Sequence, residues 1–161
     1  MRFIILLLLG YFFVLAPMQA QQARNNKALP KIINATQNSA ALEELSNQYQ
    51  SSLFSASDAN FVTTINNWKG FLQLMEEYSE TIDFDIRGVK VWMKVFWAKD
   101  GNIDYIVYAL SDRSINIDVI EWEAFLRSFI RNTKLPIKYH RGFAYNGRVM
   151  FPLSYKDPSK K

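Results

Sequence analysis

Few side chains in this sequence are suited to acid-base, nucleophilic or metal chemistry. There is one histidine, His140, and there is no cysteine, which excludes thiolate nucleophiles, disulfides and sulfur-ligated metal sites. Neither a Gly-Lys-Thr phosphate loop nor a Gly-x-Ser-x-Gly nucleophile elbow occurs. We therefore predict no catalytic residues, no cofactor and no metal. A secreted enzyme with a site around His140 and Asp100, or a Ser-His-Asp site assembled from distant residues, stays open as an alternative.

Two pairs of carboxylates lie close enough in the sequence to be considered as metal ligands or as an acid pair. Asp83 and Asp85 lie two residues apart, which would place both on one side of an extended segment as calcium ligands or as an acid pair. Calcium takes six or more oxygen ligands, and no third or fourth one is arranged beside them. Glu121 and Glu123 lie on an expected helix and cannot face the same way. We interpret both pairs as solvent-facing.

The first twenty residues have the pattern of a secretory signal peptide. One positive charge at Arg2 precedes an apolar run from Phe3 to Ala16, and Pro17 and the small residue Ala20 follow. The run is shorter than the roughly 20 apolar residues of a spanning helix. We expect cleavage after Ala20 and a periplasmic or secreted protein, with membrane attachment only if this segment is uncleaved.

The composition favours one domain that does not bind nucleic acid. The formal net charge is +4, which is too mild to indicate a nucleic-acid partner. Lysine and arginine become more frequent toward the end of the chain, as expected of a solvated basic face or of a surface for acidic partners or anionic lipid head groups. The 12 Phe, 8 Tyr and 4 Trp residues supply enough apolar surface for a core without disulfides.

The segment before residue 61 has little regular patterning. Residues 21–40 are rich in Gln, Asn, Lys and Ala and are expected to be flexible. From Ser39 to Phe54, apolar residues recur at helical spacing (Leu42, Leu45, Tyr49 and Leu53). We predict that 21–60 is a flexible region with a short amphipathic helix, that 61–157 is the folded domain, and that 158–161 is a basic tail.

A helix and a hairpin are expected next. Apolar residues from Phe61 to Met75 fall on one helical stripe, which we interpret as core, with Asn66 or Asn67 as a cap. Residues 89–97 then alternate as a strand does, and large apolar groups on both faces predict that both are at least partly covered. Asp100-Gly101 predicts a hairpin turn, and the second strand should run from Ile103 to about Leu110.

A second helix and a last strand complete the expected order. Asp118 or Asn116 could cap a helix that ends near Asn132. Asn146-Gly147 marks a turn, and residues 149–155 alternate as a strand, which Pro152 would confine to a free edge or a bulge. We predict an α+β fold: a three-stranded antiparallel sheet of β-β-α-β order with helices packed on one side, preceded by an N-terminal helical region.

This order resembles the C-terminal domain of TonB-type energy transducers. The resemblance spans roughly residues 66–157. It rests on the strand 89–97, the Asp100-Gly101 turn, the strand that reaches Ser111, the helix that follows, and a last segment that begins at a glycine and contains a proline. The family's membrane anchor and proline-rich spacer have no counterpart in the sequence, and Leu135-Pro136 stands where the family carries a tryptophan-proline pair.

The resemblance implies a function in peptide recognition. In the family, the last strand pairs with a short peptide of an outer-membrane receptor, which gives these candidate partner-binding residues: Val149, Met150, Phe151, Leu153 and Tyr155. We expect a peptide or protein partner in the cell envelope, in TonB-dependent transport, and no small-molecule substrate. The other open alternative is an interaction protein of an envelope complex, without a transport role, in which one of the amphipathic helices docks on a partner.

Overall fold

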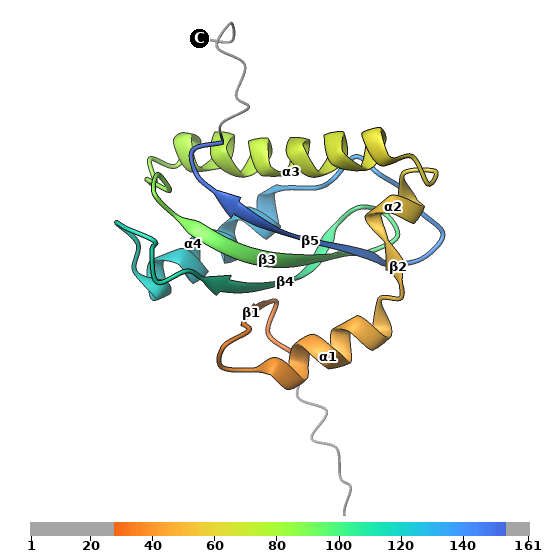
Figure 1. Ribbon diagram of the computed structural model, residues 1–161, viewed down its shortest axis with the longest axis horizontal. Helices are drawn as coiled ribbons and strands as arrows, with labels where there is room; N and C mark the ends of the chain where they lie inside the picture. The colour runs from red at the N-terminus through yellow and green to blue at the C-terminus, as the bar shows by residue number, and fades with distance from the viewer. Residues whose placement is uncertain (1–27, 154–161) are drawn as a thin grey trace, which may run out of the picture.

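The computed structural model describes residues 28–153, which form a mixed sheet with helices on both of its faces (Figure 1). In chain order the elements are β1 (Ile32–Asn34), α1 (Ser39–Gln48), β2 (Ser51–Ser52), α2 (Leu53–Ala56), α3 (Phe61–Thr81), β3 (Lys90–Trp97), β4 (Ile103–Leu110), α4 (Val119–Asn132) and β5 (Phe143–Met150). The strand order is β1-β4-β3-β5-β2. The predicted signal peptide, Tyr155 and the basic tail lie outside the described residues.

The sheet differs from the prediction, although the α+β class is confirmed. A three-stranded antiparallel sheet with helices on one side was wrong, because the sheet has five strands and is mixed. β3 is antiparallel to β4 and β5, while β1 and β2 lie outside them in parallel with β4 and β5 respectively. With three and two residues, β1 and β2 are too short to show an alternating pattern in the sequence.

The central hairpin follows the sequence closely. β3 and β4 pair from Val91 opposite Leu110 to Trp97 opposite Ile103, with an irregularity after Phe96. Gly101 in the connection has a φ of 87°, and a Cβ there would collide with the backbone oxygen of Leu135. Glycine is therefore required both by the turn and by the loop packed against it.

The two faces of the sheet bury different clusters. The first face carries the larger core, in which side chains of α3 and α4 such as Phe71 and Phe129 pack on β3 residues such as Trp97. The second face is covered over part of its area by α1, whose Ala41 and Leu45 are buried in one cluster with strand residues (Phe96, Val107 and Ala144). The expectation that both faces of β3 are at least partly covered is confirmed.

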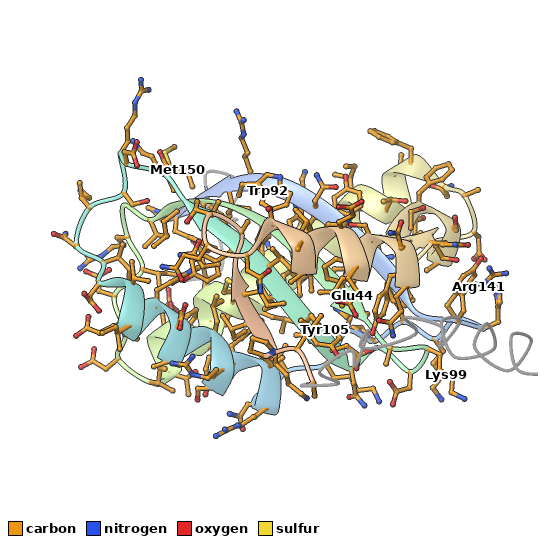
Figure 2. All side chains as sticks on the ribbon, turned by 90° about the horizontal axis from the view of Figure 1, so that it is seen from below. Glu44, Trp92, Lys99, Tyr105, Arg141 and Met150 are labelled. Atoms are coloured by element: carbon orange, nitrogen blue, oxygen red, sulfur yellow. The ribbon has the colours of Figure 1, made fainter. Side chains whose placement is uncertain are left out.

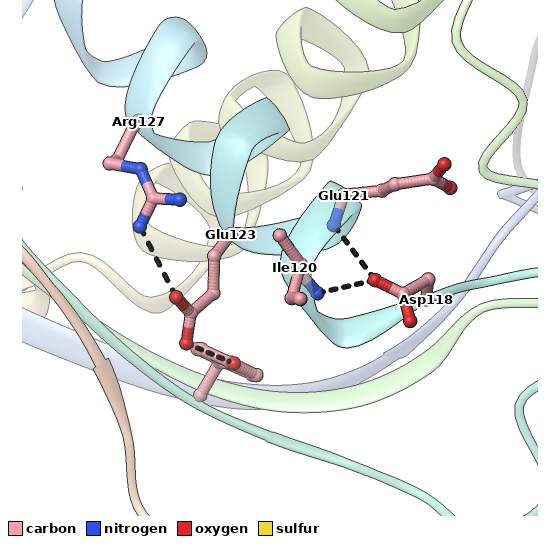
Figure 3. A network of polar contacts seen from close by, with 6 residues as sticks. Asp118, Ile120, Glu121, Glu123 and Arg127 are labelled. Carbon is pink, nitrogen blue, oxygen red and sulfur yellow. Dashed lines mark hydrogen bonds and ion pairs between the residues drawn. The ribbon is translucent and has the colours of Figure 1, made fainter.

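Capping side chains start the two long helices. Asn60 accepts a hydrogen bond from the N–H of Thr63 at 2.9 Å and begins α3, so a cap at Asn66 or Asn67 was wrong. Asp118 caps α4, as one of the two predicted choices, and its carboxylate accepts from the N–H groups of Ile120 and Glu121 at 2.7 and 3.3 Å (Figure 3). Among residues 28–153, no helix has the length and apolar content needed to span a bilayer.

Glu123 on α4 takes part in a contact that ties this helix to the sheet. Its carboxylate accepts a hydrogen bond from the hydroxyl of Tyr108 on β4 at 2.8 Å. It also forms an ion pair with Arg127, one helical turn later, at 3.2 Å (Figure 3). Burial, together with this bond to a carboxylate, raises the pKa of Tyr108 above its ordinary value. Glu123 is thus partly buried against β4, whereas Glu121 is exposed, so the solvent-facing interpretation holds for Glu121 alone.

The last strand begins earlier than predicted. Asn146 and Gly147 do not form a turn but lie inside β5, opposite Lys94 and Met93 of β3. β5 ends at Met150, so Phe151, Pro152 and Leu153, which the prediction included, are not part of the strand.

Candidate strand-addition site

β5 has an open outer side along most of its length. Its inner side pairs with β3 over the whole strand, from Phe143 to Met150. On its outer side, β2 pairs only with Phe143 and Ala144, because the chain enters α2 directly afterwards. In the part of the chain that the structure describes, no strand pairs with the outer side of residues 145–150. Figure 1 shows β5 running on past β2, which lies beside only one end of it.

The direction of the backbone groups follows from the ladder with β3. The N–H of Phe151 donates to the carbonyl of Val89 at 2.9 Å and extends this ladder by one residue. Backbone groups of successive residues in an antiparallel pair point to alternate sides, so the odd-numbered residues of β5 face β3. Asn146 and Arg148 therefore direct their N–H and C=O groups to the open side, as does Met150 at the end of the strand.

The opposite edge of the sheet is less suited to pairing. It is formed by β1, which has three residues and follows Pro30 closely in the chain. Very short edge strands and nearby prolines are common means by which proteins prevent pairing with another chain. We therefore place the candidate site at β5.

A hollow of about 290 Å³ lies beside the open edge, between β5 and α3. Trp68 of α3 is its largest lining side chain and contacts Phe71 and Tyr145, with ring centroids 5.4 and 5.2 Å apart. A Cβ on Gly147 would lie 3.1 Å from Trp68 Nε1, so glycine lets the ring approach the strand closely. The hollow is lined by Ile65, Trp68, Lys69, Leu72, Arg148, Val149, Met150, Pro152 and Leu153.

The predicted partner-binding residues do not all lie at the open edge. Val149, Met150 and Leu153 line the hollow, and Met150 is 58% exposed at the end of the strand. Phe151 is buried in the first core and its N–H donates to the carbonyl of Val89, so neither its side chain nor this N–H faces the open edge.

Sequence reasoning missed the residues that α3 contributes to the hollow. Ile65, Trp68 and Leu72 do occur at helical spacing, and this spacing is what could have found them. A stripe of that kind predicts only that a helix has an apolar face, and not that the face extends past the last strand of a sheet.

The chain after β5 is fixed by a buried carboxylate. Glu76 of α3 is 4% exposed and its Oε1 accepts a hydrogen bond from the N–H of Leu153 at 2.6 Å. The N–H of Gly88 donates to the carbonyl of Phe151 at 2.9 Å. These bonds hold Pro152 and Leu153 at one end of the hollow, which gives it a defined limit.

A second hollow, of about 400 Å³, lies on the other face of the sheet and shares Arg148 and Val149 with the first. Trp92, opposite Arg148 on β3, is its aromatic lining residue. Figure 2 looks onto this face, where Trp92 and Met150 lie on one side of α1 and Tyr105 and Glu44 on the other. The residues that line it are Lys90, Val91, Trp92, Ala109, Ser111, Arg148 and Val149.

Both hollows are lined by cations and by no acidic side chain. Lys94 lies farther along β3, where its Nζ donates to Ser46 Oγ of α1 at 2.8 Å. Burial lowers the pKa of Lys94 below its ordinary value. The charged side chains that line the two hollows are all basic: Lys69, Lys90 and Arg148.

The two residues of the alternative enzyme site, His140 and Asp100, each form polar contacts with other residues. His140 is exposed and accepts from Nε of the neighbouring Arg141 at 2.8 Å. Asp100 accepts from Asn102 and forms an ion pair with Lys134 at 3.5 Å, and the hydrogen bond from the backbone of Asn102 lowers the pKa of Asp100 first of all.

In the acidic loop before β3, which contains Asp83 and Asp85, one of the two carboxylates forms an ion pair with a neighbouring residue. Asp85 binds Arg87 at 2.7 Å, and hydrogen bonds from that side chain and its backbone lower the pKa of Asp85 to about 2. Asp83, two residues earlier, is exposed and has a φ of 54°. Among residues 28–153, no three side chains of the metal-ligating types converge.

Comparisons with protein-family models, with curated proteins and with solved structures gave no match to this chain.

Proposed function

We propose that this chain is a binding module of the cell envelope that takes up an extended peptide segment by strand addition to the outer side of β5. The observation that carries the proposal is the combination of outward-directed backbone groups at Asn146 and Arg148 with a hollow directly beside them, whose lining is apolar except for Lys69 and Arg148. In strand addition, main-chain hydrogen bonds supply affinity and pockets for alternate side chains supply selectivity.

The open edge offers enough groups for a short guest strand. Residues 145–150 span about 20 Å at roughly 3.3 Å per residue. Each main-chain hydrogen bond contributes a net of about 0.5–1.5 kcal/mol, so backbone pairing alone gives weak binding. Burial of guest side chains against Trp68, Leu72 and Leu153 adds roughly 25 cal/mol for each Å² of apolar surface removed from water.

The sequence at the N-terminus supports a location outside the cytoplasm as part of this proposal. The apolar run and Ala20 have the pattern of a cleaved leader. In that setting the guest is a segment of an envelope protein, and the resemblance to TonB C-terminal domains suggests an outer-membrane receptor.

A proline at position 148 tests the backbone contribution. Arg148→Pro removes the one N–H that faces the guest at that position and keeps the bonds to β3, since proline is accepted in edge strands where its N–H side faces solvent. Arg148→Ala is the matched control, because it loses the same charge and keeps the N–H. In a screen against peptides from envelope proteins, we expect Arg148→Pro to bind about twofold to tenfold more weakly than Arg148→Ala, because it lacks one main-chain hydrogen bond.

The unfolding midpoint of each variant shows whether the sheet is intact. Equal binding by the proline and alanine variants, with both folded, would exclude main-chain pairing at this edge. Tight binding by both, sensitive instead to changes in α3, would show that side chains of the helix carry recognition.

The alternative of an interaction protein is favoured by one observation, the exposed start of α3. Phe61 and Val62 are 70% and 66% exposed there, and Phe54 of α2 is 41% exposed. Such a group of large apolar side chains is a feature of contact surfaces. If this end of α3 contacts a partner protein, Phe61→Asp should lower the mass of the complex measured by size exclusion with that partner, and should leave peptide binding to β5 unchanged.

A further inference from the structure

We infer that the guest strand carries an acidic residue opposite Arg148 and apolar residues on either side of it, opposite Gly147 and Val149. The inference rests on the proposed strand addition and specifies the chemistry of the segment that the edge selects. It follows from the two different environments that flank the strand.

Pairing fixes the face to which each guest side chain points. Directly opposite residues of neighbouring strands direct their side chains to the same face of a sheet. A guest residue opposite Gly147 or Val149 thus points to the face covered by α3. The residue between them points to the other face, beside the side chain of Arg148.

The face toward α3 selects apolar side chains. Gly147 has no side chain of its own, so the guest residue opposite it would meet the indole of Trp68, which lies over this glycine. The guest residue opposite Val149 would lie nearest the end of the hollow lined by Leu72 and Leu153. An unpaired polar group placed there would lose its water, which is unfavourable without a hydrogen-bond partner.

The other face selects a negative charge. Arg148 lies opposite Trp92, and the diagonal neighbours of Arg148 on β3 are Lys90 and Lys94. On β5 the same face carries Asn146 and Met150, so no strand residue that surrounds Arg148 on this face is acidic. Of the acids on α1, Glu44 lies on the far side of the helix from Trp92 in Figure 2.

The size of the charge preference is modest and depends on salt. An exposed cross-strand pair of opposite charges contributes little, so an acidic residue should improve binding about twofold to fivefold over a neutral one. A basic residue at the same guest position should weaken binding by a similar factor. Both effects should decrease as the ionic strength is raised from about 0.01 M to 1 M, because the Debye length falls from about 30 Å to 3 Å.

A selection from a random peptide library tests this pattern without knowledge of the natural guest. Seven-residue peptides displayed on phage are selected on the full chain, on Arg148→Glu, and on Lys138→Glu as a control. Lys138 is exposed and is in the lining of neither hollow, and the control makes the same change of net charge. We expect apolar-acid-apolar sequences on the unchanged chain and on the control, and a basic central residue on Arg148→Glu.

The outcomes separate this inference from the proposed function. Enriched peptides that lose binding on Arg148→Pro but show no preference at the central position would overturn the inference and leave strand addition standing. Enrichment that is unaffected by Arg148→Pro, or no enrichment on a folded chain, would overturn the proposed function itself. If Arg148→Glu and Lys138→Glu select peptides with the same charge preference, the overall charge of the chain, and not position 148, would determine the preference, and the inference would be overturned.

Discussion

Replacing Gly147 by alanine tests whether Trp68 is held against β5. An added Cβ would lie 3.1 Å from Nε1 and 3.3 Å from Cζ2 of the indole, closer than the separation of about 3.5–4.0 Å at which such atoms attract. The ring has little freedom to withdraw, because it is 7% exposed and contacts the rings of Phe71 and Tyr145.

Two opposing effects decide the sign of the change. Glycine in a strand interior is less favourable than alanine by roughly 0.5–1 kcal/mol, because glycine loses more conformational freedom on folding. An extra methyl group forced into a packed site costs typically about 1–3 kcal/mol. Crowding is the larger effect, so we expect Gly147→Ala to lower the free energy of unfolding by about 1 kcal/mol.

Gly70 provides a matched control within the same structure. A Cβ at this position of α3 would meet no atom within 4 Å, so Gly70→Ala should raise the free energy of unfolding by roughly 0.8–1 kcal/mol through helix propensity. Urea unfolding followed by circular dichroism measures both variants, and an unchanged slope with urea would show that the unfolded state is the same. Combining Gly147→Ala with Trp68→Leu should remove the crowding term, because leucine leaves room for the methyl group.

One result would refute the reasoning. If Gly147→Ala stabilised the chain as Gly70→Ala does, Trp68 would not lie close to the strand, and the hollow beside the open edge would have a different shape. A destabilisation that persisted in the Trp68→Leu background would show that the strain arises within the backbone of β5 and not from the indole.

Two further predictions concern the helix start and the acidic loop. Asp118→Ala should lower the free energy of unfolding by about 1 kcal/mol because two N–H groups of α4 lose their acceptor, and Asp118→Ser should restore most of it; equal stability of all three would contradict the cap. Arg87→Ala should raise the pKa of Asp85 from about 2 only partway to its ordinary value, because the N–H of residue 87 remains as a donor, and carboxyl NMR would detect it. The favourable effect of this pair on folding should be complete above the ordinary carboxyl pKa and should disappear as pH falls through about 2; an unchanged pKa in the variant would exclude the guanidinium as its cause.

The elements with long, regular patterns could be predicted from the sequence. The strand Ile103–Leu110 has the predicted bounds, and the Asp100-Gly101 connection and the cap at Asp118 are where the sequence places them. In each case the local signal and the packing agree. Glycine at 101 suits both its positive φ and the close approach of the next loop.

Asn146-Gly147 shows where a local signal gives the wrong result. The pair is the strongest hairpin dipeptide, yet it lies inside β5. Glycine is needed at 147 because Trp68, 79 residues earlier in the chain, packs over it, as the Cβ distances show. No pattern within a few residues of a glycine can distinguish a turn from a close approach of this kind.

The open edge of β5 originates in a helix start rather than in the strand itself. β2 follows the outer side of β5 for two residues and would cover Asn146 and Arg148 if it continued. It stops because Ser52 accepts a hydrogen bond from the N–H of Ser55 at 3.2 Å and begins α2, while Leu53 turns into the core. A serine hydroxyl in this position satisfies a helix N–H that a continuing strand would not present. The segment that completes the sheet therefore also leaves the outward groups at Asn146 and Arg148 without a neighbouring strand among residues 28–153.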